Sequence, residues 1–263
     1  MDTSTPLRRS LGIQFGVIGA LLMRETLTRY GRRNIGFLWL FLEPMIFTML
    51  ITTFWTLTKG LHGSDLPIIP FAITGYSSVL LWRNGASRCT NAIRTNTALL
   101  YHRNVTVLDF FAARLLLEIA GSTTSLVVLL VVFILVGIID IPANPIMMVA
   151  AWLMLIWFTI GLGLTVGVLA ERSEGFDRAW RTISFLLFHV SGVFFMVDWL
   201  PSKVQEWILW VPMVHGVEML RGGYYGPTVP THYDLGYFVT FNAVLLLLGL
   251  FLVDRYKGSA VAQ

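Results

Sequence analysis

The sequence predicts an all-α protein that crosses a membrane several times. Of its 263 residues, 56% are hydrophobic and only 13% are charged, and the mean hydropathy is +0.71. The chain also carries 9 Trp and 18 Phe. A single soluble core of this size cannot hide so much apolar surface, so much of it is expected to face lipid. The lone Cys89 rules out a disulfide within the chain.

Six apolar segments approach the ~20 residues that a helix needs to cross a bilayer. Charged or turn-forming residues bound each of these segments. The expected spans cover residues 35–58, 66–82, 110–139, 145–170, 183–200 and 237–253. Because the number of spans is even, both termini are expected on the same side of the membrane.

The distribution of Lys and Arg predicts which side that is. Sixteen of the 19 lie before the first span, in two connections on the same side, or after the last span. The opposite connections hold only Lys59, Lys203 and Arg221. Cytoplasmic connections of multi-pass proteins carry the excess of cations, so both termini are expected in the cytoplasm. The net charge of +4 therefore reflects topology and gives no indication of nucleic-acid binding.

Residues 1–34 are expected to form a cytoplasmic helix that lies on the membrane surface and leads into the first span. Arg8 and Arg9 precede an apolar stretch, as in a signal peptide, but no small-residue cleavage site follows. Arg24 and Arg29 are among the polar residues that interrupt the apolar positions, a pattern typical of an interfacial helix.

The stretch PSKVQEWILWVPMVHGVEMLRGGYY, residues 201–225, is apolar but is interrupted by Pro212 and by Gly222 and Gly223. Each half has about a dozen residues and rises only ~18 Å as a helix, which is too short to cross a bilayer. We therefore expect two short helices that enter from the outer face and return, forming a re-entrant hairpin. The alternative is an amphipathic helix pair that lies on the outer surface.

The sequence carries no signature of ATP hydrolysis or of a metal site. A phosphate-binding loop needs a Lys followed by Ser or Thr, whereas the three lysines precede Gly60, Val204 and Gly258. His215 and Glu218 have the spacing His-x-x-Glu, but no second ligand pair accompanies them. An ATP-driven function would therefore need a separate ATPase, and no catalytic, cofactor-binding or metal-binding residue is expected in this chain.

Three motifs follow one another along the chain. They are RYGRRNIGFLWLFLEP near the first span, LLYHRNVTVLDFFAARLLLE before the third span, and WILWVPMVHGVEMLR before the sixth. In this order the motifs resemble the permease subunit of capsular polysaccharide exporters, which belong to the ABC-2 type transporters. The similarity extends over nearly the full length, so residues 1–263 are expected to form a single ABC-2 type transmembrane domain.

The resemblance implies that two copies of this permease combine with two copies of a separate ATPase, which binds ATP and Mg²⁺. Such a complex carries a lipid-anchored polysaccharide from cytoplasm to periplasm across the bacterial inner membrane, through a channel between the two permeases. Periplasmic or outer-membrane export components are further implied partners. Exporters of O-antigen or teichoic acid are similar and stay open as alternatives.

A secondary transporter or a membrane-embedded transferase is the alternative from another class. Ion-coupled carriers place ionisable residues at the membrane midplane and often have repeated halves. Here Glu43 and Glu118 lie nearer the cytoplasmic ends of their spans, and no repeat is visible. A transferase would need convergent acid, base or metal-binding groups, which the sequence does not show.

The connection between residues 83 and 114 has the length and polarity of a short coupling helix that seats in the ATPase. The residues expected at that contact are Leu99, Leu100, Tyr101, His102 and Arg103. A solvated basic loop that only reflects topology is the alternative.

A polymer pathway is expected at the cytoplasmic end of the second span, just before the connection that begins at residue 83. Arg83 and Arg88 are candidates to attract an anionic polymer at the inner mouth of the channel. Tyr76 and Trp82 are candidates to stack on its sugars. Topology signalling by the arginines and membrane-belt positions for the aromatic side chains are the alternatives.

The hairpin is expected to gate the outer exit of the channel. The residues assigned to this gate are Trp210, Pro212, His215, Glu218 and Arg221. Glu218 and Arg221 are three residues apart on one short helix and could therefore pair. The alternative is that this pair only stabilises the hairpin.

A hinge clamp is expected where a carboxylate lies inside the first span. Its members are Trp39, Glu43, Pro44, Arg114 and Glu118. Glu43 sits ~12 Å along the helix, in the cytoplasmic half, where Pro44 favours a kink. A charge facing lipid is unfavourable, so Glu43 is expected to pair with Arg88 or Arg114. Arg114 could instead pair with Glu118, its i+4 neighbour.

Overall fold

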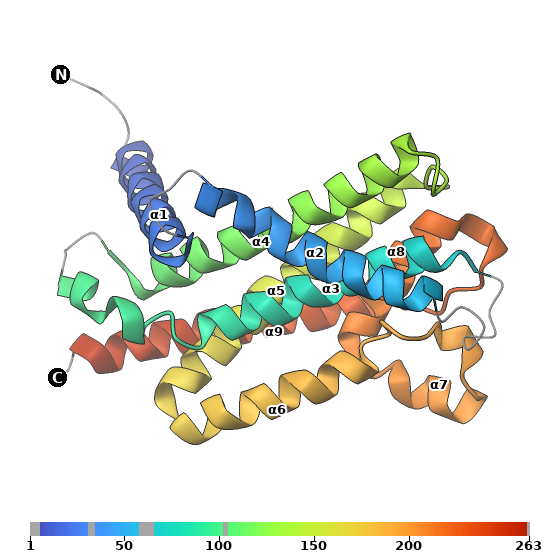
Figure 1. Ribbon diagram of the computed structural model, residues 1–263. Helices are drawn as coiled ribbons and strands as arrows, with labels where there is room; N and C mark the ends of the chain where they lie inside the picture. Colours follow the sequence, from blue (N-terminus) through green and yellow to red (C-terminus); the bar gives the residue numbers. More distant parts are fainter. Residues whose placement is uncertain (1–5, 31–34, 58–65, 102–104, 262–263) are drawn as a thin grey trace.

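The chain is a bundle of helices in a computed structural model that describes residues 6–30, 35–57, 66–101 and 105–261 (Figure 1). No β-strand occurs in these ranges. The elements are α1 (Pro6–Tyr30), α2 (Ile35–Leu57), α3 (Ile68–Cys89), η2 (Arg94–Tyr101), α4 (Val107–Leu135), α5 (Pro145–Arg172), α6 (Glu174–Val190), η3 (Val197–Trp199), α7 (Ser202–Ile208), α8 (Pro212–Tyr225), η4 (Gly226–Thr228) and α9 (Leu235–Val261). The predicted all-α class is therefore confirmed.

Three of the expected spans are helices long and apolar enough to cross a membrane. They are α4, α5 and the Leu235–Tyr256 part of α9, in the regions expected for the third, fourth and sixth spans. The described part of α2 adds a shorter apolar stretch, Met45–Leu57. The crossings over residues 35–58, 66–82 and 183–200, and the surface placement of α1, stay predictions.

The helix predicted over residues 183–200 is wrong in its bounds. Helix α6 begins at Glu174, where the Ser173 hydroxyl oxygen accepts a hydrogen bond from the backbone N–H of Phe176 at 3.3 Å. It ends at Val190, because Gly192 adopts a φ of +84°, a left-handed conformation that stops an α-helix. The charged residues 174–181, expected in a cytoplasmic connection, are therefore the first turns of this helix.

Helix α5 lies at the centre of the bundle and packs against α3, α8 and α9. Glycines allow this close packing on two of its faces. A Cβ atom added at Gly161 would lie 3.0 Å from the backbone nitrogen of Leu246 on α9. One added at Gly163 would lie 2.8 Å from the Leu115 side chain on α4. Small residues that let helix backbones approach are typical of packed membrane helices.

The two ends of the bundle carry different elements (Figure 1). Helix α1, the connection with η2 and the C-terminal end of α9 lie at one end. The turn between α4 and α5, together with α7 and α8, lies at the other, which we call the hairpin end. The expected coupling segment and the expected gate are thus separated by the length of the long helices.

Residues 201–225 form two short helices, α7 and α8, as the sequence predicts. They differ sharply in burial. Every residue from 213 to 224 in α8 is buried, whereas most of α7 is exposed. Whether the pair enters the membrane as a re-entrant hairpin is not shown by this arrangement and stays a prediction.

Candidate functional site

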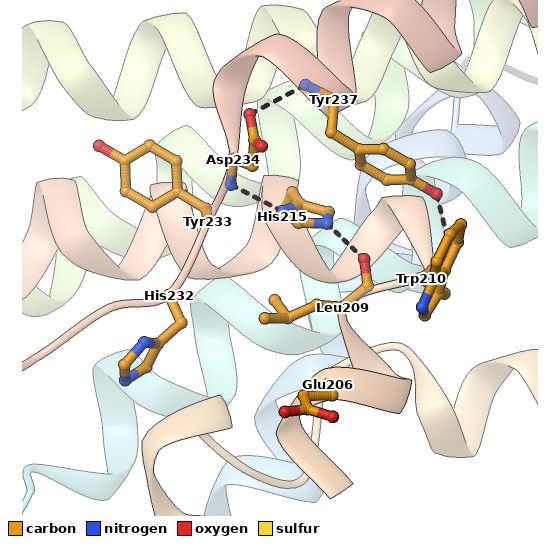
Figure 2. Close-up of a pocket in the computed structure, with 8 residues that line it drawn as sticks. All are labelled: Glu206, Leu209, Trp210, His215, His232, Tyr233, Asp234 and Tyr237. Atoms are coloured by element: carbon orange, nitrogen blue, oxygen red, sulfur yellow. Dashed lines mark hydrogen bonds between the residues drawn. The ribbon is translucent and has the colours of Figure 1, made fainter. Parts of the chain in front are cut away.

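A pocket of about 410 Å³ opens at the hairpin end between α7, α8 and the start of α9 (Figure 2). Its lining residues are Glu206, Leu209, Trp210, His215, His232, Tyr233, Asp234 and Tyr237. Two residues of the predicted gate, Trp210 and His215, are therefore brought together here. The described residues contain no group of three or more His, Cys, Asp or Glu side chains that could hold a metal ion.

His215 lies at the centre of this pocket and joins its walls. Its Nδ1 accepts a hydrogen bond from the backbone N–H of Asp234 at 2.9 Å, so Nδ1 carries no proton. Its Nε2 lies 2.8 Å from the carbonyl oxygen of Leu209, which can only accept, so Nε2 carries the proton and donates it. The contacts therefore fix one neutral tautomer, and burial lowers the pKa of His215 below its usual value.

The first turn of α9 completes the frame of the pocket. The Asp234 carboxylate accepts a hydrogen bond from the backbone N–H of Tyr237 at 2.9 Å. The Tyr237 hydroxyl donates to the carbonyl oxygen of Trp210 at 2.8 Å. Side chains from α8 and α9 thus hold two consecutive carbonyl groups of the turn after α7, and the Trp210 ring projects beside them (Figure 2).

Acid should destabilise the protein through His215. Because burial lowers its pKa in the folded state, the neutral ring contributes stability above the unfolded pKa of about 6.5. This contribution is lost as the pH falls below that value, since protonated Nδ1 cannot accept from Asp234. We expect the melting temperature to drop by about 2 °C or more between about pH 7.5 and about pH 5.5. His215→Gln should show a smaller drop, and an equal drop in both proteins would contradict this role.

Arg221 is completely buried beside this site and binds backbone carbonyl groups. Its Nη1 donates to the oxygens of Gly192 at 2.5 Å and Phe195 at 2.8 Å, and its Nη2 donates to Val193 at 2.8 Å. The guanidinium carbon lies 3.6 Å from the centre of the Phe71 ring. The side chain therefore organises the segment that follows α6.

Glu218 also takes backbone partners, one on each side of α8. Its Oε1 accepts from the N–H of Val197 at 3.1 Å, and its Oε2 accepts from the N–H of His232 at 3.0 Å. The predicted direct pair between Glu218 and Arg221 is therefore wrong for this arrangement. Helix α8 is buried, so the hydrogen bonds of each charged group go to a different neighbouring segment, while the two opposite charges still attract each other.

Ionic contacts at the opposite end join α1, α3 and α4. Arg88 lies 3.4 Å from the Glu118 carboxylate, and Arg114 lies 3.2 Å from Glu25 of α1. Arg114 also donates to the carbonyl oxygen of Arg88 at 2.6 Å. Arg114 therefore pairs with Glu25 and not with Glu118, and Glu118 pairs with Arg88. The role expected for Glu43 as the clamp's acid stays a prediction.

The remaining clamp residues lie on α2. The Trp39 side chain is half exposed, and Glu43 is exposed within this chain. Pro44 lies inside α2, which continues through it to Leu57, and its side chain falls outside the described set. The exposed face of α2 leaves room for contacts beyond this single chain.

The expected coupling segment contains a short 3-10 helix, η2, which ends at Tyr101. Leu99 is partly buried against the core cluster that includes Phe111. The side chains of Leu100 and Tyr101, and all of His102 and Arg103, fall outside the described residues. The structure thus places a helical segment here and leaves its contact with an ATPase as a prediction.

The expected pathway residues are not gathered on one open surface. Tyr76 and Trp82 are 2% and 0% exposed and belong to the central core. Arg83 is partly buried, with its guanidinium 5.7 Å from the Phe188 ring centre, whereas Arg88 is exposed. Contact of a polymer with Tyr76 or Trp82 would need a different arrangement of this chain, so their role stays a prediction.

Comparison with known proteins identifies the family. The sequence profile described as "ABC-2 type transporter" matches residues 16–225, which is most of the chain and includes α8. The chain belongs to the ABC-2 type transporter family. The conclusion agrees with the resemblance carried by the three motifs.

Several relatives of this ABC-2 type transporter chain are named for polysaccharide export or transport. Capsule polysaccharide export inner-membrane protein CtrC of Neisseria meningitidis serogroup B is 49% identical over 98% of both chains. Capsule polysaccharide export inner-membrane protein BexB of Haemophilus influenzae is 44% identical, also over 98% of both chains. Polysialic acid transport protein KpsM of Escherichia coli is 25% identical over 92% of this chain and 94% of its own.

Sequence reasoning missed the residues after α8 that complete the pocket of this ABC-2 type transporter chain. Asp234 precedes the apolar run of α9, and an Asp in that position is a recognised helix start signal. Nothing local indicates that its backbone N–H meets His215. Gln14 of α1, which donates to the Asp109 carboxylate of α4, was missed for the same reason, because the two are 95 residues apart.

Proposed function

We propose that this chain is the membrane permease subunit of an ATP-driven exporter of capsular polysaccharide. The observation that carries the proposal is the 49% identity over 98% of both chains to a protein named for capsule polysaccharide export in the inner membrane. The three apolar helices and the family membership support a membrane component. The substrate class follows from the relatives' names, so export of another glycan, O-antigen or teichoic acid, is the second candidate.

The proposed complex contains two copies of the permease and two copies of a separate ATPase. ATP and Mg²⁺ bind to the ATPase, because the sequence lacks a phosphate-binding loop. The end with α1, η2 and the end of α9 faces the cytoplasm, in agreement with the excess of Lys and Arg in those segments. The hairpin end then faces the periplasm, where the polymer leaves between the two permeases and meets further export components.

Deletion and complementation in an encapsulated host test this function. Loss of the gene is expected to abolish surface polysaccharide and to accumulate the same polymer inside the cell. Re-expression of this chain together with its own ATPase should restore the surface polymer. Accumulation of O-antigen or teichoic acid in place of capsule would support the second candidate. Normal surface levels of all three glycans in the deletion strain would contradict both.

The coupling role of the segment around η2 gives a separate prediction. Leu100→Asp places a charge where the ATPase is proposed to bind, so it should reduce co-purified ATPase by about tenfold. The permease itself should stay folded, because the substitution lies at the end of the short helix η2, in a connection between two long helices. Ala179→Asp, an exposed position on α6, is the matched control and should leave the yield of complex unchanged. Full ATPase recovery with Leu100→Asp would remove this segment from the interface.

The other predicted sites enter this proposal as parts of the transport path. Arg83 and Arg88 attract the anionic polymer at the cytoplasmic mouth, with Tyr76 and Trp82 behind them. The α7–α8 hairpin gates the exit, and Glu43 is the acid of a hinge clamp that joins α1 to α2 beside the path. Position supports the roles of Arg88 and Glu43, because both are exposed within one chain, whereas Tyr76 and Trp82 are buried in it.

A further inference from the structure

The pocket around His215 lies at the depth of the lipid head groups. The apolar part of α9, Leu235–Tyr256, has 22 residues and would span ~33 Å, close to the thickness of the hydrocarbon core. Asp234 caps the first turn of this helix, and Tyr237 lies within that turn. The pocket therefore sits where the span leaves the hydrocarbon, whichever side of the membrane that end faces.

Exposed tryptophans mark the same depth. Trp207 and Trp210 are 79% and 76% exposed, and Trp199 is also exposed. All three flank or belong to α7, beside the start of α9. Tryptophan rings with an apolar body and a polar N–H gather at the boundary between lipid and water. Helix α7 is therefore expected to lie in the head-group layer.

The pocket itself has the chemistry of a cation site. Trp210, Tyr233 and Tyr237 supply three aromatic rings, and Glu206 and Asp234 supply two carboxylates on the rim (Figure 2). None of the eight lining residues is Lys or Arg, and the His215 ring is fixed in its neutral form. Aromatic faces and carboxylates both attract a cation, whereas an anionic group such as an acidic sugar would be repelled.

We propose that this pocket binds the ammonium group of a zwitterionic phospholipid, of which phosphatidylethanolamine is the simplest example. A lipid is favoured over a soluble amine because the pocket lies at head-group depth beside three exposed tryptophans. Lys203 precedes Glu206 by three residues on α7, so the two side chains are neighbours on that helix. The lysine supplies a cation for the lipid phosphate next to the carboxylate that receives the ammonium.

The lipid site goes beyond the proposed function, although two of its lining residues, Trp210 and His215, also belong to the proposed gate. Its occupant stays in the membrane and is not transported. A bound head group would add a contact between α7 and the start of α9, the two elements that Tyr237 already joins through the carbonyl oxygen of Trp210. Lipid binding to the purified chain can therefore be measured whether or not the chain exports capsule.

Native mass spectrometry of the delipidated full-length protein tests the proposal. The probes are phosphatidylethanolamine and phosphatidylglycerol with identical short acyl chains, and free ethanolamine as the soluble source of the same ammonium. Phosphatidylethanolamine should bind about three- to fivefold more tightly than phosphatidylglycerol, as expected for cation–π contacts at a partly exposed site. Free ethanolamine should bind far more weakly than the lipid.

Matched variants separate the pocket from general lipid adhesion. Glu206→Gln with Asp234→Asn should remove the preference for phosphatidylethanolamine, and Asn can still cap α9. Trp210→Leu should weaken the binding of phosphatidylethanolamine about threefold. Trp207→Leu, an equally exposed Trp outside the pocket, and Glu174→Gln, an exposed acid on α6, should change neither value.

Three results would overturn the proposal. Equal affinity for the two lipids shows that the ammonium is not recognised. An undiminished preference in the double carboxylate variant shows that recognition lies elsewhere. Free ethanolamine binding as tightly as the lipid assigns the pocket to a soluble amine.

Discussion

Replacing Arg221 by Met is expected to cost about 3–5 kcal/mol of folding stability, the loss typical of breaking a buried charged network. The guanidinium is 0% exposed and donates hydrogen bonds to the carbonyl oxygens of Gly192, Val193 and Phe195. Met has a similar length but no donor, so these carbonyls would lose their buried partner. Arg221→Lys keeps the charge without the planar fork and should show an intermediate loss.

Thermal unfolding of the purified protein in detergent measures this effect. Cys89 is the single cysteine and is completely buried, so a thiol-reactive dye reports its exposure when the protein unfolds. Arg221→Met should lower the melting temperature by about 10 °C. Arg178→Met is the control, because that side chain is 71% exposed and forms only a surface pair with Glu174. Equal melting temperatures for Arg221→Met and the wild type would show that the carbonyl contacts contribute little.

Replacing Gly161 by Val is expected to have the second large effect, through the contact between α5 and α9. A Cβ atom at this position would lie 3.0 Å from the backbone nitrogen of Leu246 and 3.1 Å from the side chain of Leu245. Backbone atoms cannot rotate away as a side chain does, so the two helices must separate. Overpacking of this kind costs about 1–3 kcal/mol, and the lost helix contact adds to it.

The same thiol assay, together with the yield of monodisperse protein, checks this prediction. Gly16→Val is a matched control, since Gly16 lies in helix α1 and no atom lies within 4 Å of an added Cβ there. Both substitutions change the helix propensity by a similar amount, so their difference isolates the packing. If the two variants unfold at the same temperature, the close approach at Gly161 does not limit stability.

Much of the fold follows from apolar length alone. The regions of α4, α5 and α9 could be predicted because each contains a long apolar run bounded by charge, and two short helices between residues 201 and 225 followed from their interruptions. The end of α6 could not, because its stop depends on Gly192 and on carbonyl groups that Arg221 reaches from 26 to 29 residues away. The number of apolar residues in a short stretch does not reveal a contact between residues that far apart.

The candidate site shows the same limit at the level of side chains. Local spacing suggested that Glu218 could pair with Arg221 and that Arg114 could pair with Glu118, because helix neighbours three or four residues apart often pair. The structure gives Glu218 two backbone N–H partners and pairs Arg88 with Glu118 across two helices. Buried charges take whichever partner the packing brings near, and packing between distant segments is not encoded in short spacing.

The two glycine faces of α5 have a mechanical consequence. Gly161 meets the backbone of α9, and Gly163 meets Leu115 of α4, so rotating α5 about its own axis would drive a larger side chain into a neighbour on either side. Packed helices of this kind move together as one body. Any movement during a transport cycle is therefore expected to carry α4, α5 and α9 as a unit.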